Sequence, residues 1–381
     1  MADVTVSSIQ TGSQAIDGAD GLTVNIAITA VDLSRSIVMI TQSNAASENR
    51  IRRHIFGVEL SSTTNIQLTR AESKFAKDVI IEWTVIEFDA TAIEGIQTGS
   101  VDRTSAVENT TITAVDVSKT LVVTSLSTDG GSITTAVLAT AELTSATNLA
   151  LESDAVPSSG ESEYRYQIIE FASTAEVDIQ QVSSTVVGYA GTNVQTITAV
   201  DTTKTFIASG GVLTDTNINP ILRGTATLDL TSSTQVTATR SDVGSALNDA
   251  TYNYWVVELT GASNKVEKID VSFTASDTEK TASWTALSTT ETALFDTYSL
   301  GNRVPVLTSG GNSDDGNNLF SVALNDGADG ATVTRGVAKD PYRVISYAVD
   351  FTAGASSLNV PINLSITDIL STSARLNWEQ G

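Results

Sequence analysis

One nine-residue motif recurs four times along the chain, and this repetition constrains the fold more than any other feature of the sequence. ITAVDLSRS begins at Ile28, ITAVDVSKT at Ile112 and ITAVDTTKT at Ile197, and a diverged copy, WTALSTTET, begins at Trp284. Successive copies therefore begin 84, 85 and 87 residues apart. Self-similarity at a nearly fixed period is the signature of a tandem array, in which each unit repeats one supersecondary structure.

Two further markers follow the motif in the same order in every copy. The second marker is ELSSTTNIQLTR in the first copy, with ELTSATNLALE, DLTSSTQVTATR and NDGADGATVTR as its counterparts. The third is a closing segment that reads WTVIEF, YQIIEF, YWVVEL or SYAVDF. The second marker ends at Arg70, Glu152, Arg240 and Arg335, and the closing segment ends at Phe88, Phe171, Leu259 and Phe351.

The local pattern within each copy is that of β-strands. In the segment 23–29, Val24, Ile26 and Ile28 alternate with polar or small residues, which gives one buried and one wet face. Turn signals rich in Gly, Asn and Asp separate such runs. We therefore predict an all-β chain of four tandem immunoglobulin-like β-sandwich repeats. The predicted domains are residues 1–90, 91–174, 175–262 and 263–352, followed by residues 353–381, a linker with a short C-terminal β segment.

The repeats also predict where particular side chains lie. Ile28, Ile112 and Ile197 should occupy equivalent strand positions, because a slip of one residue would turn every side chain to the wrong face. The aromatic residues of the closing segments should be buried in the cores of their own domains. These residues are Trp83, Tyr166 and Tyr254.

Charge and composition exclude several classes of function. The net charge of −23, from 21 basic and 44 acidic residues, argues against binding to nucleic acid or to anionic membranes. The chain has no Cys, so disulfides and thiolate metal sites are excluded. The start, MADVTVSSIQTGSQ, lacks the basic and apolar regions of a signal peptide, and no apolar run is long enough to span a membrane. We expect synthesis in the cytoplasm and no membrane insertion.

Two recurring acids are interpreted as structural. Asp32, in the first copy of the motif, precedes a hydroxyl residue by two positions, which is typical of a turn closed by the Asp side chain. The acid near the end of each closing segment stands alone in its repeat, and so does not form the carboxylate pair of a glycosidase. We expect it to accept hydrogen bonds from the backbone or from Arg70, Arg240 and Arg335, with Glu152 at that place in the second repeat. The closing-segment acids are Glu87, Glu170, Glu258 and Asp350.

His54 is the only histidine, so any Ser-His-Asp device would have to use it. No G-x-S-x-G motif surrounds a serine, and we predict no catalytic residue and no enzymatic activity. Arg50, Arg52, Arg53 and His54 instead form a basic cluster on an acidic chain. This cluster is either a docking interface for an acidic surface or a solvated strand edge or loop.

Two loops near the end of the fourth repeat are rich in oxygen ligands and Gly, NSDDGNN and NDGADG. Such loops can hold Ca²⁺, although neither has the spacing of an EF-hand. Asn, Asp and Gly are also the residues that tight hairpins need. We predict no cofactor, and keep four weak candidates for a calcium site. They are Asp314, Asp315, Asp326 and Asp329.

The C-terminal segment INLSITDILSTSARLNWEQG resembles the opening of a fibronectin type III domain over about 20 residues. It has a preceding Pro, an alternating strand, a Thr-Ser-Ala turn, and a strand with Leu and then Trp. A fragment this short cannot bury its own apolar side chains. We expect it to be an interface with another chain or the start of a longer domain. The apolar positions are Leu364, Ile366, Leu376 and Trp378.

Across residues 1–352, the VD-[ST]-K turn and the closing aromatic-x-V-V-E-F strand resemble modules of tailed-bacteriophage structural proteins. The resemblance implies a non-enzymatic virion protein, either a tail fibre, a tail appendage or a capsid decoration protein. Such a protein would form a homo-oligomer, bind other virion proteins and could contact a host-surface glycan or protein. The alternatives are a bacterial cell-surface adhesin or filament subunit, which would be extracellular, and the accessory part of a carbohydrate-active enzyme.

Overall fold

The computed structural model of the protein is almost entirely β-structure in the part of the chain that it describes. Apart from strands, this part contains one short 3₁₀ helix, η2 (Val117–Lys119). No helix there is long and apolar enough to cross a membrane. The described residues are 2–17, 20–44, 55–70, 79–128, 137–157, 162–187, 191–214, 226–240, 249–285, 287–296, 320–335, 342–351, 364–365, 369–370, 373–374 and 377–378.

The first six strands form two three-stranded antiparallel sheets, with the orders β1-β6-β3 and β2-β5-β4. Second-with-fifth and third-with-sixth pairing is that of an immunoglobulin-like sandwich. The first strand, however, takes the edge beside the sixth that a seventh strand holds in the immunoglobulin fold. We call these strands set 1. They are β1 (Val6–Ile16), β2 (Thr23–Ala27), β3 (Ser36–Asn44), β4 (Gly57–Ser62), β5 (Asn65–Thr69) and β6 (Val79–Phe88).

The same strand order recurs in the next eighteen strands, which we call sets 2, 3 and 4. Each set falls inside one of the domains expected from the repeats, whose number and bounds stay a prediction. Set 2 comprises β7 (Ile93–Asp102), β8 (Val107–Thr111), β9 (Thr120–Thr128), β10 (Thr140–Ser145), β11 (Asn148–Glu152) and β12 (Ser162–Phe171). Set 3 comprises β13 (Val177–Val186), β14 (Thr192–Thr196), β15 (Thr205–Thr214), β16 (Ala226–Ser232), β17 (Gln235–Arg240) and β18 (Ala250–Leu259). Set 4 comprises β19 (Lys265–Phe273), β20 (Glu279–Ser283), β21 (Thr292–Asp296), β22 (Phe320–Leu324), β23 (Gly330–Arg335) and β24 (Tyr342–Asp350).

The isoleucines that open the motif lie at equivalent positions, directly after the second strand of sets 1, 2 and 3. Ile28, Ile112 and Ile197 each donate a backbone hydrogen bond of 3.0 Å to the turn between the fourth and fifth strands. Trp284 makes the same bond, of 2.9 Å, to Asp329 in set 4. The expected equivalence of the three isoleucines is therefore confirmed, although each lies one residue beyond the strand and not within it.

The closing segments form the sixth strand of each set, and this strand is buried on both faces near its end. In β6, Ile81 packs with Val79 and Val85 into the core between the two sheets of set 1. Ile86 and Phe88 belong to a second core, shared among the sets. The run of consecutive apolar residues in the closing segment follows from this double burial.

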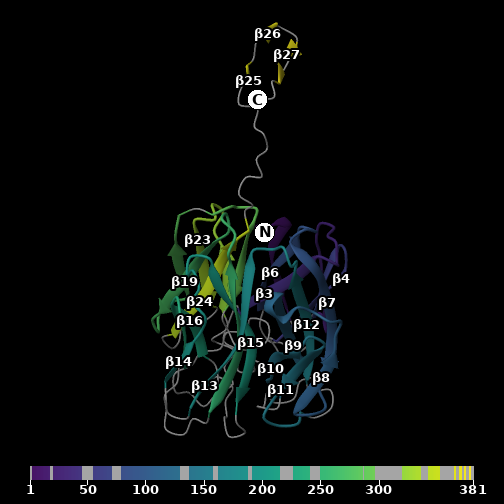
Figure 1. The fold of residues 1–381 in the computed structure, drawn as a ribbon, viewed down its shortest axis with the longest axis vertical. Helices are drawn as coiled ribbons and strands as arrows, with labels where there is room; N and C mark the ends of the chain where they lie inside the picture. Colours follow the sequence, from purple (N-terminus) through teal and green to yellow (C-terminus); the bar gives the residue numbers. More distant parts are fainter. Residues whose placement is uncertain are drawn as a thin grey trace.

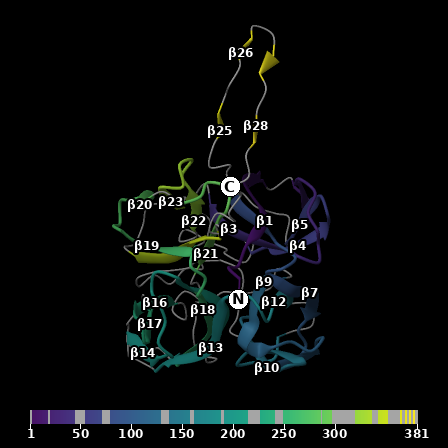
Figure 2. The ribbon, with the colours of Figure 1, turned by 45° about the horizontal axis from the view of Figure 1, so that its top comes forward.

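The four sets lie around a common centre, with set 4 beside set 1 and set 3 beside set 2 (Figure 2). The last residue of each closing segment contributes to the core at this centre. The ring of Phe88 packs edge-on against Phe171 at 5.8 Å and against Phe351 at 5.9 Å between ring centroids. Leu259 of set 3 belongs to the same core and is fully buried. Burial of these residues holds the sets in one closed ring.

The first residues of the chain run through the hub of this ring, and we call residues 2–5 the N-terminal strap. Ala2 forms a parallel bridge with Ala175, in the connection between sets 2 and 3. The Asn264 side chain, between sets 3 and 4, donates a hydrogen bond of 2.9 Å to the Val4 carbonyl. Val4 itself is fully buried. The strap therefore ties the start of set 1 to the far side of the ring.

The C-terminal strands lie apart from the four sets and pair with one another (Figure 1). Leu364 lies opposite Trp378 in this pairing, whereas Ile366 and Leu376 lie outside the described residues. The expected packing of this segment on another chain stays a prediction. The strands are β25 (Leu364–Ser365), β26 (Ile369–Leu370), β27 (Ser373–Ala374) and β28 (Asn377–Trp378).

Candidate functional site: the junctions between strand sets

The Asp of the repeated motif closes a turn, as the sequence predicts. The Asp32 carboxylate accepts hydrogen bonds from the Ser34 amide at 2.9 Å and from the Ser34 hydroxyl at 2.7 Å. Asp116 and Asp201 accept the same two bonds from the residue two positions on. The hydrogen bond from Ser34, and after it that from Arg35, lowers the pKa of Asp32 below its ordinary value. These three carboxylates therefore hold the backbone of their own turns.

The acid of each closing segment also accepts a backbone donor, which confirms the second structural interpretation. Glu87 accepts from the Asp32 amide at 3.3 Å, and Glu170 accepts from the Asp116 amide at 2.6 Å. The same bond recurs at 2.7 Å between Glu258 and Asp201 in set 3, and at 3.1 Å between Asp350 and Ser288 in set 4. Each acid thus ties the motif turn to the end of the sixth strand.

The expected pairing of these acids with the recurring arginines is wrong. Arg70 and Arg335 are buried and donate to backbone carbonyls in the connection between the first and second strands. Their guanidinium groups also lie over aromatic rings of their own sets, 5.9 Å from the centroid of Phe56 and 5.3 Å from that of Phe273. Backbone carbonyls and ring faces compensate the buried charge, because both attract a cation.

In set 2 the buried guanidinium comes from the connection between β7 and β8. The residue equivalent to Arg70 is Ser153, because its amide donates to Ala106 as that of Arg70 donates to Leu22. Arg103, at the end of β7, is fully buried and donates to the Ser153 hydroxyl. It lies 5.9 Å from the centroid of the Tyr164 ring. The assignment of Glu152 to this place is therefore wrong by one residue. In set 2, Arg103 supplies the buried positive charge that Arg70 supplies in set 1.

The basic residue of the motif donates hydrogen bonds to backbone carbonyls at the end of its own set or at the start of the next. Arg35 donates to the carbonyl of Phe88 at 2.8 Å, where set 1 ends. Lys119 donates to the carbonyls of Ala175 and Val177, and Lys204 donates to that of Gly261 at 2.6 Å. The motif thus serves both a turn and the connection to the next set.

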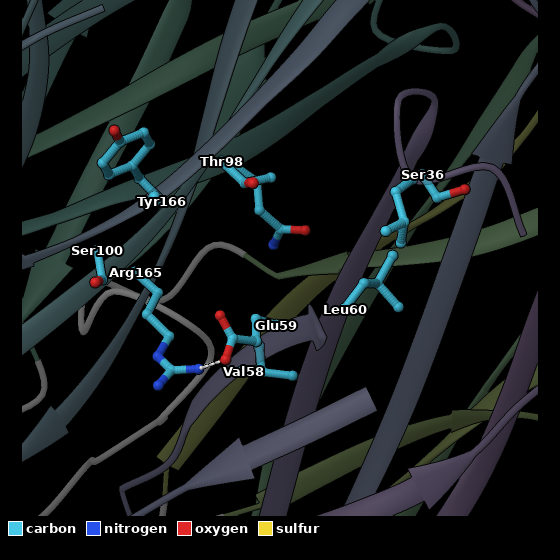
Figure 3. Close-up of a pocket in the computed structure, with 11 residues that line it drawn as sticks. Ser36, Val58, Glu59, Leu60, Thr98, Ser100, Arg165 and Tyr166 are labelled. Carbon is cyan, nitrogen blue, oxygen red and sulfur yellow. Dashed lines mark ion pairs between the residues drawn. The ribbon is translucent and has the colours of Figure 1, made fainter. Parts of the chain in front are cut away.

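Side-chain amides and ions join sets 1 and 2. The Gln167 amide accepts from the Val38 N–H and donates to the Val38 carbonyl, both at 2.8 Å, as a neighbouring strand would. Arg165 pairs with Glu59 at 2.5 Å. These groups border a cavity of about 230 Å³. Figure 3 shows Arg165 and Glu59 facing one another, while Tyr166 points away from them.

Sets 2 and 3 are joined through the backbone. Thr140 of β10 pairs with Gly211 of β15, which makes one six-stranded sheet, β13-β18-β15-β10-β11-β8. Gly211 has a φ of 104°, and a Cβ atom there would lie 2.2 Å from the Ala139 carbonyl oxygen. The exposed Gln181 repeats the amide pairing, accepting at 2.9 Å from the Leu143 amide. Only glycine allows the two sets to approach this closely.

Sets 3 and 4 are joined by charges around Asp229, which is almost fully buried. Its two carboxylate oxygens accept from Lys268 at 3.0 Å and from Arg343 at 2.8 Å. Arg343 also holds the pKa of Asp270 below its ordinary value by a hydrogen bond. The Tyr347 hydroxyl accepts from the Leu230 amide at 3.3 Å beside them. Two cations compensate the burial of one carboxylate here.

Sets 4 and 1 meet through hydroxyl groups, and we call this contact the seam. The Val322 amide donates to the Thr41 hydroxyl, and the Ser321 hydroxyl donates to that of Ser43, both at 3.3 Å. A cavity of about 250 Å³ lies between Val322 and the strand that carries Glu82. Burial raises the pKa of Glu82, whose carboxylate accepts a 2.9 Å hydrogen bond from Ser13. In the described part of the chain this carboxylate has no cationic partner.

The aromatic residues of the closing segments differ in burial. Tyr254 is fully buried, as expected, whereas Trp83 and Tyr166 are half-buried. The Trp83 ring covers Gly12, where an added Cβ atom would lie 2.4 Å from it, and Tyr166 covers Gly99 in the same way. Both glycines belong to the segment IQTGS, at residues 9–13 and 96–100. This duplicated segment is a fourth marker, which the sequence reasoning missed.

The residues proposed as sites from the sequence fall largely beyond the described part of the chain. Asp326 and Asp329 are exposed in the turn between β22 and β23, where the Asp329 carbonyl accepts from the Trp284 amide. Among the described residues, no three His, Cys, Asp or Glu side chains are grouped to hold a metal ion. The calcium site stays a prediction. Outside the described residues lie Arg50, Arg52, Arg53, His54, Asp314 and Asp315.

A comparison of the chain with protein-family models, curated proteins and solved structures gives no match.

Proposed function

We propose that the protein is a non-enzymatic structural component of the virion of a tailed bacteriophage, as a tail fibre, tail appendage or capsid decoration protein. One observation carries the proposal. The polar residues that recur from set to set bond backbone groups of turns and connections, as Asp32, Glu87 and Lys119 do. Recurring bonds of this kind hold the turns and connections of every set rigid, which supports a structural role.

The construction of the ring supports the same proposal. Its sets share a core at the centre, so that no set is free to move on a flexible linker. The net charge of −23 keeps copies apart in solution until specific contacts form. The resemblance of the repeats to phage modules is the reason for proposing a virion as the assembly. Other virion proteins are the partners that the resemblance implies.

Labelling of particles tests the proposal. Antibodies raised against the purified chain are applied, with gold-conjugated secondary antibody, to tailed particles purified from lysed cells that carry the gene. Intact cells of the same culture are labelled in parallel. We expect gold on the particles and none on the cells. Label on intact cells and not on particles would replace the proposal by the alternative, a cell-surface adhesin or filament subunit.

A further inference from the structure

We propose that the seam between sets 4 and 1 is a self-association surface, at which the ring opens and the chain joins head to tail with a second copy of itself. The inference concerns the isolated protein and goes beyond the proposed function. It begins with the symmetry of the ring. At each junction, one set presents its fourth strand to the sheet that holds the first and sixth strands of the next set.

The equivalence of the junctions is visible in single residues. At junction 1–2 the Val58 amide donates to the Ser125 hydroxyl at 3.1 Å, and at the seam the Val322 amide donates to Thr41 at 3.3 Å. Val58 and Val322 are the same position of the fourth strand. A contact between two different surfaces is heterologous, and it can close a ring or continue from one molecule to the next.

Three of the four junctions are closed by the chain itself, because the connections between consecutive sets span them. The seam has no such connection. Set 1 is held there by the contacts of the seam itself, by the packing of Phe88 against Phe351 in the shared core, and by the N-terminal strap. The strap depends on a few bonds, including that from Asn264 to the Val4 carbonyl and that from the Ala2 amide to Thr174. Release of the strap therefore leaves sets 1 and 4 joined by non-covalent packing alone, and the seam can open without breaking any set.

The polar contacts of the seam differ from those of junctions 1–2 and 3–4. The two hydrogen bonds from Val322 and Ser321 join neutral groups, whereas junction 1–2 has the Arg165–Glu59 ion pair and junction 3–4 has Asp229 between two cations. The half-buried carboxylate of Glu82 adds a desolvation cost that no cation among the described residues offsets. With no chain connection across it and a half-buried carboxylate beside it, the seam is the junction at which we expect the ring to open first.

An open chain carries two complementary surfaces, the exposed fourth strand of set 4 and the outer face of β6 in set 1. A second open chain fits both. Closure within one chain wins at low concentration, because its effective concentration is of the order of millimolar. Association between chains then needs a concentrated sample and a condition that opens the seam, and it produces reciprocal dimers or longer head-to-tail forms.

Engineered cysteines test this directly, because the chain has none of its own. The hydroxyls of Ser43 and Ser321 lie 3.3 Å apart across the seam. The double variant S43C/S321C, oxidised with glutathione disulfide, should form its disulfide within one chain, and this serves as the positive control. The full-length single variants S43C and S321C are mixed in equal amounts at high concentration, warmed to just below the melting midpoint, cooled and oxidised.

We expect the mixture to give disulfide-linked dimers that neither single variant gives alone, on a non-reducing gel and by light scattering. The additional substitution Asn264→Ala in both chains should raise the linked fraction several-fold, because it weakens the strap. A mixture that gives no more dimer than the single variants, while the double variant closes internally, would overturn the proposal. An unchanged fraction with Asn264→Ala would overturn the role of the strap. Neither result bears on the labelling of virions.

Discussion

The junction between sets 2 and 3 and the seam between sets 4 and 1 solve the same packing problem by different means. At the first, β10 pairs directly with β15 through Thr140 and Gly211, so a backbone bridge joins the two sets. At the seam, hydroxyls such as Thr41 stand between the two backbones, and a cavity remains beside them. A close backbone pairing leaves almost no room for a side chain at the paired residue. A contact made by a hydroxyl group can be substituted with a small loss in the free energy of unfolding. The comparison predicts a graded series of stability effects around the ring.

The largest effect is expected at Gly211. Gly211→Ala places a methyl group against the Ala139 carbonyl, at a φ that L residues rarely adopt. We expect a loss of about 3 kcal/mol or more in the free energy of unfolding, measured by denaturant titration. Gly327→Ala is the matched control, because the nearest atom to an added Cβ there lies at 3.4 Å. Equal stability of the two variants would show that the backbone pairing does not hold sets 2 and 3 together.

A smaller effect is expected at Gln167, in junction 1–2. Gln167→Ala leaves the buried amide and carbonyl groups of Val38 without their partner, which costs about 2 kcal/mol. Gln181→Ala removes the same kind of contact from junction 2–3, but Gln181 is exposed and the backbone bridge remains. Thermal unfolding should therefore show a lower midpoint for the first variant than for the second. The reverse order would contradict the ranking of the junctions.

At the seam itself the effect of removing a hydroxyl should be smaller again. Thr41→Val keeps the shape of the side chain and removes the acceptor of the Val322 amide, which costs about 1 kcal/mol. Thr41→Ser retains the hydroxyl and should retain most of the stability. Hydrogen exchange followed by mass spectrometry should show faster exchange in β22 for Thr41→Val. If exchange quickens instead in β10, the seam is not where the ring first opens.

The smallest effect is a pH dependence caused by Glu82. Burial raises its pKa in the folded protein above the ordinary value of 4.5, so folding favours the protonated form. Below that ordinary value the side chain is protonated in both states and does not change the free energy of unfolding. As pH rises toward the raised pKa, desolvation of the carboxylate lowers the free energy of unfolding, and above the raised pKa this penalty is constant. The melting midpoint of Glu82→Gln minus that of the parent should therefore increase from about pH 4 to neutral pH. A difference that is flat with pH would mean that the carboxylate is well solvated.

Much of the local structure could be predicted from the repeats. Asp32 and its counterparts hold turns, Glu87 and its counterparts accept backbone donors, and the residue that opens each motif lies at one position. These contacts depend on a few neighbouring residues or on pairing within one set, which a repeated pattern specifies. The place of the buried arginine in set 2 was missed, because Arg103 lies within the connection between β7 and β8 and donates to the carbonyls of that connection from there.

By itself the sequence determined the all-β class and the chemistry of the motif turn, because alternation and turn bonding are local. The tertiary structure alone decided how the sets face one another. Val38 meets a glutamine 129 positions away, and Val322 meets a threonine 281 positions away. No pattern along the chain encodes such pairs, since each depends on the outer face of a sheet whose neighbour is fixed only when the ring closes.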